Sequence, residues 1–267
     1  MNRKPQLNAS NKRYIYSMKN ILIILCLLFI SATGSAQKFN IFKGDTINRT
    51  DAKGLKQGIW KKYYSNDVLF SEGVYKDGKH TGTFKTFYKS GKPQSILKFR
   101  GMSEINDAEI FSEDSGLMAK GKYIDRIKDS LWVYYDRMGK KSSEEFYIKG
   151  KKEGELKLFY PNGQLSRTVI YKKDIQNGVY KEFFMDGTPK VSGVMKNGGF
   201  EGLLTIFHPN GKVWQKGIYK NGLKEGKWQN YSENGVLESE DEYKKGVWLN
   251  PTTDDKGPIE VKEPNEQ

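Results

Sequence analysis

The chain has 267 residues, with 45 basic and 32 acidic side chains, a formal net charge of +13 and a single cysteine, Cys26. One cysteine excludes an intramolecular disulfide framework. Five basic residues and no acidic residue precede residue 37, so the rest of the chain carries 40 basic and 32 acidic side chains, a net charge of +8. Lysines that alternate with aromatic residues, as at Lys61 and Lys85, are typical of solvated strand faces and protected sheet edges.

The N-terminal residues have the order of a secretory signal peptide. A basic residue precedes an apolar run over residues 21–30, and small residues follow. This run is too short to span a bilayer stably, which takes about 20 residues. We therefore expect residues 1–36 to be an N-terminal extension plus signal peptide, with translation starting at Met18 and cleavage between Ala36 and Gln37. The mature protein would then be periplasmic, outer-membrane-associated or extracellular.

A 24-residue period runs from residue 58 to residue 246 without insertion or deletion. We call the first residue of each of the eight repeats the lead position, and write +n for the residue n positions after it. The lead residues are Gly58, Gly82, Asn106, Ser130, Gly154, Gly178, Gly202 and Gly226. Position +5 is aromatic in every repeat, at Tyr63, Phe87, Phe111, Tyr135, Phe159, Phe183, Phe207 and Tyr231. Self-similarity this regular indicates a repeat architecture.

Each repeat is expected to contain two strands and two turns. Glycine occurs at +9 in six repeats, often after Asn or Asp as in Asn162-Gly163, and a second turn falls near +20, as at Asp77-Gly78. Such dipeptides supply the positive φ of tight hairpin turns. The intervening segments are about seven residues long and rich in Tyr, Phe, Val and Ile, which is typical of strands. The predicted fold class is all-β: an elongated, single-layer antiparallel meander sheet built from eight 24-residue β-hairpin repeats.

The repeats occupy most of the chain. Residues 37–53 precede them as a lead-in or cap, and the array spans residues 54–250. Residues 251–267 are polar, contain proline and have no period, so they are expected to form a disordered tail.

The aromatic positions recur in a pattern that resembles a known family. The pattern Gly-x-Trp-x-x-Tyr-Tyr stands at Gly58, Trp60, Tyr63 and Tyr64. It resembles the MORN repeat variants of bacterial YwqK-type proteins, which are often labelled antitoxins. The resemblance covers about residues 54–248 and implies a single-layer elongated β-sheet with a binding or scaffolding role. Repeat 3 departs from the pattern at Asn106 and Ala108, where Gly and an aromatic residue are expected, so we expect a weaker or bent ladder there.

The aromatic side chains define candidate rows on the two faces of the sheet. Positions +2 and +6 share one face of a strand and +5 lies on the other. The rings at +5 and +17 are expected to form ladders from repeat to repeat. Which face is exposed is not evident from the sequence. The candidate ligand-binding row, at +2 and +6, is Trp60, Tyr64, Phe84, Tyr88, Tyr160, Tyr180, Phe184, His208 and Trp228.

Catalytic and metal-binding patterns are absent from the sequence. His80 and His208 lie at different positions of the repeat, and no His-Glu-x-x-His, Gly-x-Ser-x-Gly or Walker-type sequence occurs. Adjacent carboxylates such as Glu144 and Glu145 point to opposite faces of a strand. An acidic cluster in repeat 3 lacks the spacing of a calcium loop; it comprises Glu104, Asp107, Glu109, Glu113 and Asp114. We expect no enzymatic activity, no metal and no cofactor.

The function predicted from these features is that of an exported, non-catalytic repeat scaffold. Its partner would be another envelope or extracellular protein, bound with an affinity spread along the array. Two alternatives remain open: binding of a cell-envelope glycan or an anionic lipid surface through the aromatic and lysine rows, and an antitoxin-like pairing with a partner protein. Nucleic acid is not expected as a partner of an exported protein.

Overall fold

The computed structural model describes residues 37–42, 45–114 and 116–249. The predicted signal peptide with Ala36 and the predicted tail at 251–267 lie outside these residues. The described chain forms two compact units. The first contains the residues up to Trp60 together with Tyr75–Lys79, and the second contains Lys61–Val74 and the residues from His80 onward.

Short strands build the first unit. They are β1 (Asn40–Phe42), β2 (Asp45–Ile47), β3 (Arg49–Thr50) and the beginning of β4 (Lys56–Tyr63). β1 pairs antiparallel with β2, and β3 pairs antiparallel with β4. The Lys56 Nζ atom lies 4.4 Å from the centre of the Trp60 ring and 4.7 Å from that of Tyr75, and the two rings meet edge to face.

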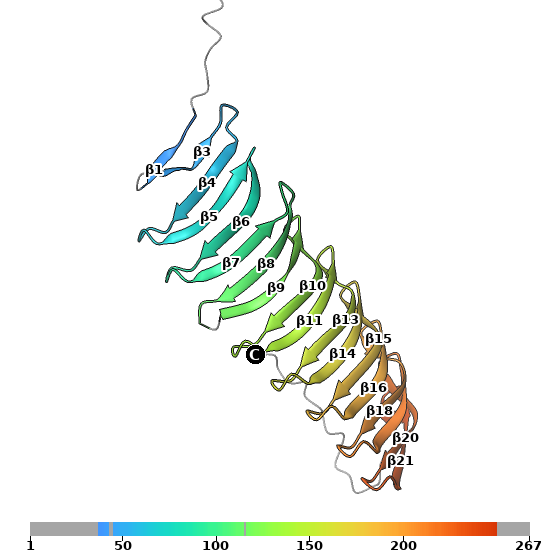
Figure 1. The fold of residues 1–267 in the computed structure, drawn as a ribbon. Coiled ribbons are helices and arrows are strands. Elements are labelled where there is room, and N and C mark those ends of the chain that lie inside the picture. The colour runs from blue at the N-terminus through green and yellow to red at the C-terminus, as the bar shows by residue number, and fades with distance from the viewer. Residues whose placement is uncertain (1–36, 43–44, 115, 250–267) are drawn as a thin grey trace, which may run out of the picture. The chain divides into compact units, whose positions relative to one another are not determined.

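The second unit is a sheet in which each strand pairs with its neighbours in chain order (Figure 1). Beyond β4, the strands are β5 (Leu69–Lys76), β6 (Lys79–Phe87), β7 (Pro93–Phe99), β8 (Ile105–Ser112), β9 (Gly116–Ile124), β10 (Ile127–Tyr135), β11 (Lys141–Ile148), β12 (Lys151–Lys152), β13 (Gly154–Phe159), β14 (Leu165–Lys172), β15 (Ile175–Phe183), β16 (Pro189–Lys196), β17 (Gly199–Phe200), β18 (Gly202–Phe207), β19 (Val213–Lys220), β20 (Leu223–Tyr231), β21 (Leu237–Lys244) and β22 (Val247–Trp248).

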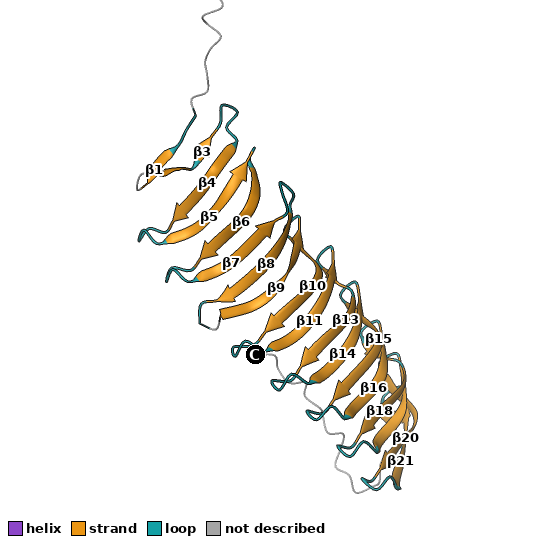
Figure 2. Cartoon of the chain, in the orientation of Figure 1, coloured by secondary structure: helices purple, strands orange, loops and turns teal. Residues whose placement is uncertain are grey.

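All pairings from β6 to β22 are antiparallel. The described residues contain no helix, and Figure 2 shows one layer of strands joined by loops. The prediction of an all-β, single-layer antiparallel meander is therefore confirmed. Within the same residues there is accordingly no helix able to cross a membrane.

The predicted turns are present at both ends of the strands. At +9, Gly163 has a φ of 87°, and at the other turn Asn221 and Gly222 have φ values of 52° and 78°. These angles lie in the left-handed region that glycine and asparagine enter most readily. Turn chemistry of this kind fixes the length of each hairpin and thus preserves the register from one repeat to the next.

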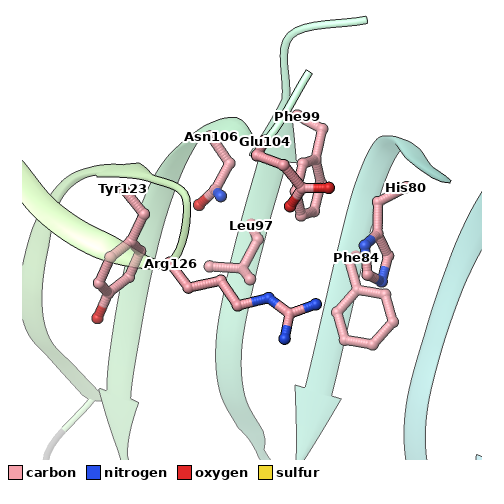
Figure 3. Close-up of a pocket in the computed structure, with 8 residues that line it drawn as sticks. All are labelled: His80, Phe84, Leu97, Phe99, Glu104, Asn106, Tyr123 and Arg126. Carbon is pink, nitrogen blue, oxygen red and sulfur yellow. The ribbon is translucent and has the colours of Figure 1, made fainter. Parts of the chain in front are cut away.

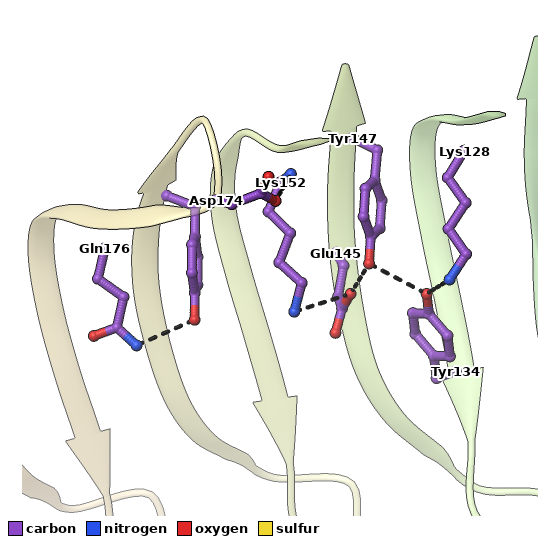
Figure 4. Close-up of polar contacts among 8 residues, drawn as sticks. Lys128, Tyr134, Glu145, Tyr147, Lys152, Asp174 and Gln176 are labelled. Carbon is purple, nitrogen blue, oxygen red and sulfur yellow. Dashed lines mark hydrogen bonds and ion pairs between the residues drawn. The ribbon is translucent and has the colours of Figure 1, made fainter. Parts of the chain in front are cut away.

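Two irregularities in each typical repeat bend the strands. The lead residue has a positive φ, 68° at Gly82 and 61° at Ser130, and a register shift accompanies it in the ladder between β9 and β10. A second shift falls between +4 and +5, for example between Leu158 and Phe159. Irregularities of this kind bend a strand and increase its twist. The curved strands bury side chains on the face that carries +2 and +17, which we call the inner face (Figure 4).

Residue size is matched along the middle of the inner face, where +15 of one repeat lies beside +2 of the next. Gly121 leaves room for Trp132, because a Cβ atom on Gly121 would lie 2.3 Å from Cδ2 of that ring. In repeat 3 the sizes are reversed, since Leu97 at +15 pairs with Ala108 at +2. Ala108 is therefore 2% exposed although it is small, and the ladder from β7 through β8 to β9 continues across Asn106 without a register shift.

Candidate functional site

Part of the predicted ligand row lies in the core of the sheet. Trp228 is 0% exposed, and its indole Nε1 donates a hydrogen bond to the carbonyl oxygen of Ile218 at 3.2 Å. Phe84 and Tyr180 at the same repeat position are half-buried. The sequence placed Trp228 on a candidate ligand surface, and this placement is corrected by the structure. The ring is a packing residue, because the curved strands enclose it and its polar atom is used internally.

The +6 members of the row connect each repeat to the next. Tyr64, Tyr88 and Tyr160 donate hydrogen bonds of 2.8 Å to the carbonyl oxygens of Phe87, Phe111 and Phe183 respectively. His208 takes the place of a tyrosine, with its Nε2 atom 2.8 Å from the carbonyl oxygen of Tyr231. Phe184 has no polar atom for this bond. The side chains that sequence reasoning offered to a ligand thus have a structural role in joining repeats, each bond contributing about 0.5–1.5 kcal/mol.

The aromatic contacts also differ from the expected ladders. Rings at +17 meet the +2 ring of the following hairpin, as in Tyr123 with Trp132 at 4.9 Å and Tyr219 with Trp228 at 5.2 Å between ring centres. Both contacts are edge to face, the geometry that aromatic quadrupoles favour. Three +5 rings, those of Tyr135, Phe159 and Tyr231, instead lie near lysine ammonium groups. An example is the Phe159 ring, whose centre lies 4.1 Å from an ammonium nitrogen.

Lysines cover the aromatic core from the position two residues before the lead, written −2. Lys128 Nζ lies 4.8 Å from the centre of the Trp132 ring and 5.4 Å from that of Tyr147. Lys224 Nζ lies 4.1 Å from the Trp228 ring centre. Burial lowers the pKa of Lys224. Cation–π attraction holds these ammonium groups over the rings.

A polar network links neighbouring hairpins on the inner face (Figure 4). Lys128 Nζ donates to the Tyr134 hydroxyl at 2.7 Å, and that hydroxyl lies 3.5 Å from the Tyr147 hydroxyl. Tyr147 in turn donates a short hydrogen bond to Glu145, whose Oε2 atom is 3.4 Å from Lys152 Nζ. Burial, and then the hydrogen bond to Glu145, raises the pKa of Tyr147 well above its ordinary value. The phenol therefore stays protonated, and the network cross-links strands rather than supplying a base or nucleophile.

Repeat 3 has a different backbone from its neighbours. Asn106 replaces the lead glycine and stays in the ladder, pairing with Phe99 on β7 and Tyr123 on β9. In the next hairpin the corresponding tyrosine pairs two residues earlier, as Tyr123 with Lys128. The loss of the lead bulge therefore lengthens the connection before β8 to residues 100–104. This longer connection brings Glu104 to the inner face.

A pocket of about 280 Å³ opens at this point (Figure 3). This volume is close to the lower end of the range of roughly 300–1,000 Å³ found for small-molecule sites. Four aromatic rings, one leucine and three polar side chains form its wall. The lining residues are His80, Phe84, Leu97, Phe99, Glu104, Asn106, Tyr123 and Arg126. We call it the repeat-3 pocket.

Asn106 is the most buried polar group of the repeat-3 pocket. The residue is 3% exposed, and its Oδ1 atom is buried without a hydrogen-bond donor. Neither Glu104 nor Arg126 forms an ion pair with any other described residue, although both line the pocket. Buried polar groups in native proteins are almost always hydrogen-bonded. The pocket thus contains a buried acceptor, Asn106 Oδ1, that lacks a donor, and two charged groups, Glu104 and Arg126, that lack an ion-pair partner in the described chain. Groups of this kind are characteristic of a binding site.

The other carboxylates of the acidic cluster lie apart from the pocket. Asp107 pairs with Arg100 at 3.1 Å, and Glu109 lies 3.6 Å from Lys98. In the part of the chain that the structure describes, no three His, Cys, Asp or Glu side chains are grouped to hold a metal ion. The cluster seen in sequence is thus divided between surface ion pairs and the single pocket carboxylate, Glu104.

Sequence reasoning missed the repeat-3 pocket, although it noted the residues that make it. Asn106 and Ala108 were interpreted as a weakening of the ladder, and Glu104 as part of an acidic cluster. The available signal was their coincidence: a polar residue at the lead position and an acid at −2 replace the consensus within one repeat. Departures that fall together in an otherwise regular array indicate a specialised site.

The opposite face of the sheet, the outer face, carries an exposed apolar band. Positions +1 and +16 are cross-strand neighbours there, as in Leu131 with Phe146 and Leu203 with Ile218. The band occupies repeats 4, 6 and 7, with side chains 41–56% exposed, and repeat 5 interrupts it with Glu155 at +1. We define the outer apolar band as Leu131, Phe146, Val179, Val194, Leu203 and Ile218. In repeats 3 and 8 the same positions are charged, for example Lys227 and Glu242.

The sequence matches the family model of the MORN repeat variant at residues 56–77, 81–100, 152–173, 200–221 and 224–245. The chain therefore carries MORN repeat variants, and the prediction of this repeat type is confirmed. The residues between 101 and 151, which include repeats 3 and 4, fall outside these matches. Comparison with curated proteins found no match.

Solved structures give only distant likenesses. A point mutant of Staphylococcus aureus TarM in complex with fondaparinux, alpha-GlcNAc-glycerol and UDP aligns over 44% of this chain and 20% of its own, at 12% identity and a TM-score of 0.27. A TcdB2-TccC3-Cdc42 structure aligns over 79% and 16%, at 10% identity and a TM-score of 0.19. Alternansucrase in complex with isomaltononaose aligns over 75% and 16%, at 16% identity and a TM-score of 0.17. The chain thus spans 20% or less of each of these proteins, and these scores carry no functional argument.

Proposed function

We propose that this protein is an exported, non-catalytic scaffold that binds a protein partner through the outer apolar band. The observation that carries the proposal is the exposure of these apolar side chains on a sheet face that no other layer covers in the described chain. Leu203 is 56% exposed and Val179 is 48% exposed. Exposed apolar side chains grouped on one face and rimmed by polar residues are characteristic of protein interaction sites.

The arrangement of the band favours a protein over a glycan or lipid. Its side chains are aliphatic apart from Phe146, so they offer complementary packing to apolar side chains rather than ring stacking on sugars. The glycan and anionic-lipid alternatives relied on an exposed row of aromatics with lysines. In the structure the +2 rings are largely enclosed, the +6 polar ends are bonded to backbone, and lysines such as Lys128 and Lys224 lie over rings.

A non-catalytic role agrees with the chemistry of the inner face. The ionisable groups of the polar network pair with one another, as Glu145 does with Tyr147 and Lys152, which leaves them poorly suited to proton transfer. Because the band draws on three repeats, the binding energy would be distributed over several contacts.

A matched pair of substitutions tests the interface. Leu203→Glu puts a charge into the band, whereas Thr83→Glu puts the same charge at the same repeat position, +1, outside it. Leu203→Glu should weaken capture of the partner by about tenfold, because a charge would have to be buried against apolar surface. Thr83→Glu should leave capture unchanged. The measurement is quantitative mass spectrometry of proteins retained from an envelope extract by the two variants and the parent chain.

Two results would count against the proposal. A partner retained equally by both variants would place the interface elsewhere. Release of the bound material by soluble sugars, or by salt alone, would favour the glycan or lipid alternative.

The prediction of export has its own test: N-terminal sequencing of the native protein should find Gln37 as the first residue. An intact Met1 or Met18 start in the cytoplasm would contradict it and favour the antitoxin-like alternative.

A further inference from the structure

Four repeats place a lysine at −2, and in each the ammonium group lies over aromatic rings. These are Lys56, Lys128, Lys152 and Lys224. Repeat 3 has Glu104 at this position, so an acceptor replaces the ammonium group. Glu104 stands beside Asn106, whose buried Oδ1 atom is also an acceptor. The repeat-3 pocket is therefore built to receive a hydrogen-bond donor, most favourably a cationic one.

The pocket also carries a positive charge. Arg126 lies in the turn between β9 and β10 and extends across the pocket toward Phe84, while Glu104 enters from the connection between β7 and β8 (Figure 3). No ion pair joins Arg126 and Glu104. The two opposite charges thus face one space. A ligand that carries both an ammonium group and a carboxylate would pair with each of them.

The remaining wall of the pocket is apolar. Leu97 lies between the charged groups in the view of Figure 3, and Phe84 and Phe99 stand beside it. His80 stacks on Phe99 with ring centres 4.9 Å apart and an interplanar angle of 10°. These side chains can cover the apolar part of a ligand.

We propose that the repeat-3 pocket binds a free α-amino acid with an apolar side chain. The ammonium group donates to the Glu104 carboxylate and to Asn106 Oδ1, and the carboxylate accepts from the Arg126 guanidinium. The side chain packs against Leu97 and the Phe84 ring. This ligand class satisfies the buried acceptor and pairs both charges, and its size agrees with a pocket of about 280 Å³.

Other small ligands use the pocket less completely. A neutral sugar would leave Glu104 and Arg126 without ionic partners. A simple anion would meet the Glu104 carboxylate, and a simple amine would leave Arg126 without a partner. A divalent cation would find a single carboxylate, whereas protein sites for calcium supply about six to eight oxygen ligands.

Isothermal titration calorimetry of the full mature chain tests the proposal, with L-leucine and L-phenylalanine as probes. Isoamylamine and 4-methylpentanoate, which each lack one charged group of leucine, and glucose serve as comparison ligands. We expect saturable binding of at least one amino acid, about tenfold weaker binding of the amine and the acid, and no binding of glucose. Absence of saturable amino-acid binding, or glucose binding of equal strength, would overturn the proposal.

Substitutions of the two charged residues test whether the ligand binds in this pocket. Arg126→Gln and Glu104→Gln should each weaken binding by about tenfold. Arg137→Gln, which alters an exposed turn arginine in the next repeat, should leave it unchanged. Circular dichroism of all three variants should show the same β spectrum. Binding that survives Arg126→Gln undiminished would remove the ligand from this pocket. Leucine binding should also persist in Leu203→Glu, so failure here is separable from failure of the outer-face interface.

Discussion

Repeats 3 and 4 are neighbours in one sheet and use equivalent positions differently. In repeat 4, Lys128 covers the Trp132 ring, so the chain fills its own inner face. In repeat 3, Glu104 and Asn106 take the positions of Lys128 and Ser130, and the small residue Ala108 takes that of Trp132. One repeat is closed by its own side chains, and the other holds a pocket with a buried acceptor. A repeat array can thus keep its strand pairing while a few substitutions convert a structural position into a ligand position.

The largest expected effect comes from removing the large ring of repeat 4. Trp132→Ala deletes a side chain that is 1% exposed and should destabilise the sheet by about 3–5 kcal/mol. The matched change in repeat 3, Ala108→Gly, should cost about 0.5–1 kcal/mol. Denaturant titration followed by circular dichroism would measure both. Equal losses of stability in the two variants would show that Trp132 and Ala108 contribute equally to the packing of their repeats, which would contradict this account.

An exchange of sizes sharpens the same comparison. Ala108→Trp alone should destabilise repeat 3 by about 1–3 kcal/mol, because Leu97 occupies the space that the ring needs. Adding Leu97→Gly recreates the pair seen at Gly121 and Trp132 and should recover part of the loss. The test is the melting temperature of the two single variants and the double variant. Strictly additive effects would argue against direct packing between the two positions.

Much of the fold follows from the sequence, because its signals are local. The 24-residue period, the turn glycines and the strand composition predict hairpins that pair in order. Which face encloses its side chains depends on the bulges, and these arise from backbone angles that a period does not reveal. The alternation rule therefore grouped Trp228 with Tyr64, whereas the structure gives one a place in the core and the other a bond to backbone.

The repeat-3 pocket could not be predicted from the sequence for a related reason. Asn106 at a lead position looks like a defect when it is judged against the consensus. Its consequence, a longer connection that carries Glu104 to the inner face, requires the pairing of Phe99 with Asn106 to be known. Arg126 lines the pocket from the next turn at the same edge of the sheet, 20 residues after the lead of repeat 3. Only the assembled hairpins bring these groups together.

A smaller effect is expected at the links between repeats. Tyr88→Phe removes the hydrogen bond to the Phe111 carbonyl that joins repeat 2 to repeat 3, and should cost about 0.5–1.5 kcal/mol. Phe184→Tyr offers the reverse change at the same repeat position and should stabilise the array slightly. Thermal melting compares the two. A neutral result for Tyr88→Phe would mean that the hydroxyl bond contributes nothing net to the joint.

The smallest effect is a difference in alkaline stability between repeats 3 and 4. Burial raises the pKa of both Tyr123 and Tyr147, and the hydrogen bond to Glu145 raises that of Tyr147 further. The folded state therefore holds these protons more tightly than the unfolded state. This stabilisation is fully present below about pH 10, the unfolded value, and is lost as the pH rises above it. Melting at about pH 8 and about pH 11, on either side of that value, should show a smaller alkaline loss for Tyr147→Phe than for Tyr123→Phe. A larger alkaline loss for Tyr147→Phe than for Tyr123→Phe would contradict the inference that the hydrogen bond to Glu145 raises the pKa of Tyr147 further.

The contrast between a closed and an open repeat is tested most directly by giving repeat 3 the lysine of its neighbour. Glu104→Lys should place an ammonium group over the pocket as Lys128 does over Trp132, and calorimetry should then find no L-leucine binding. Glu113→Lys, the same charge change at an exposed site in the same repeat, should leave binding at the level of the parent chain. Leucine binding that persists unchanged in Glu104→Lys would contradict the account.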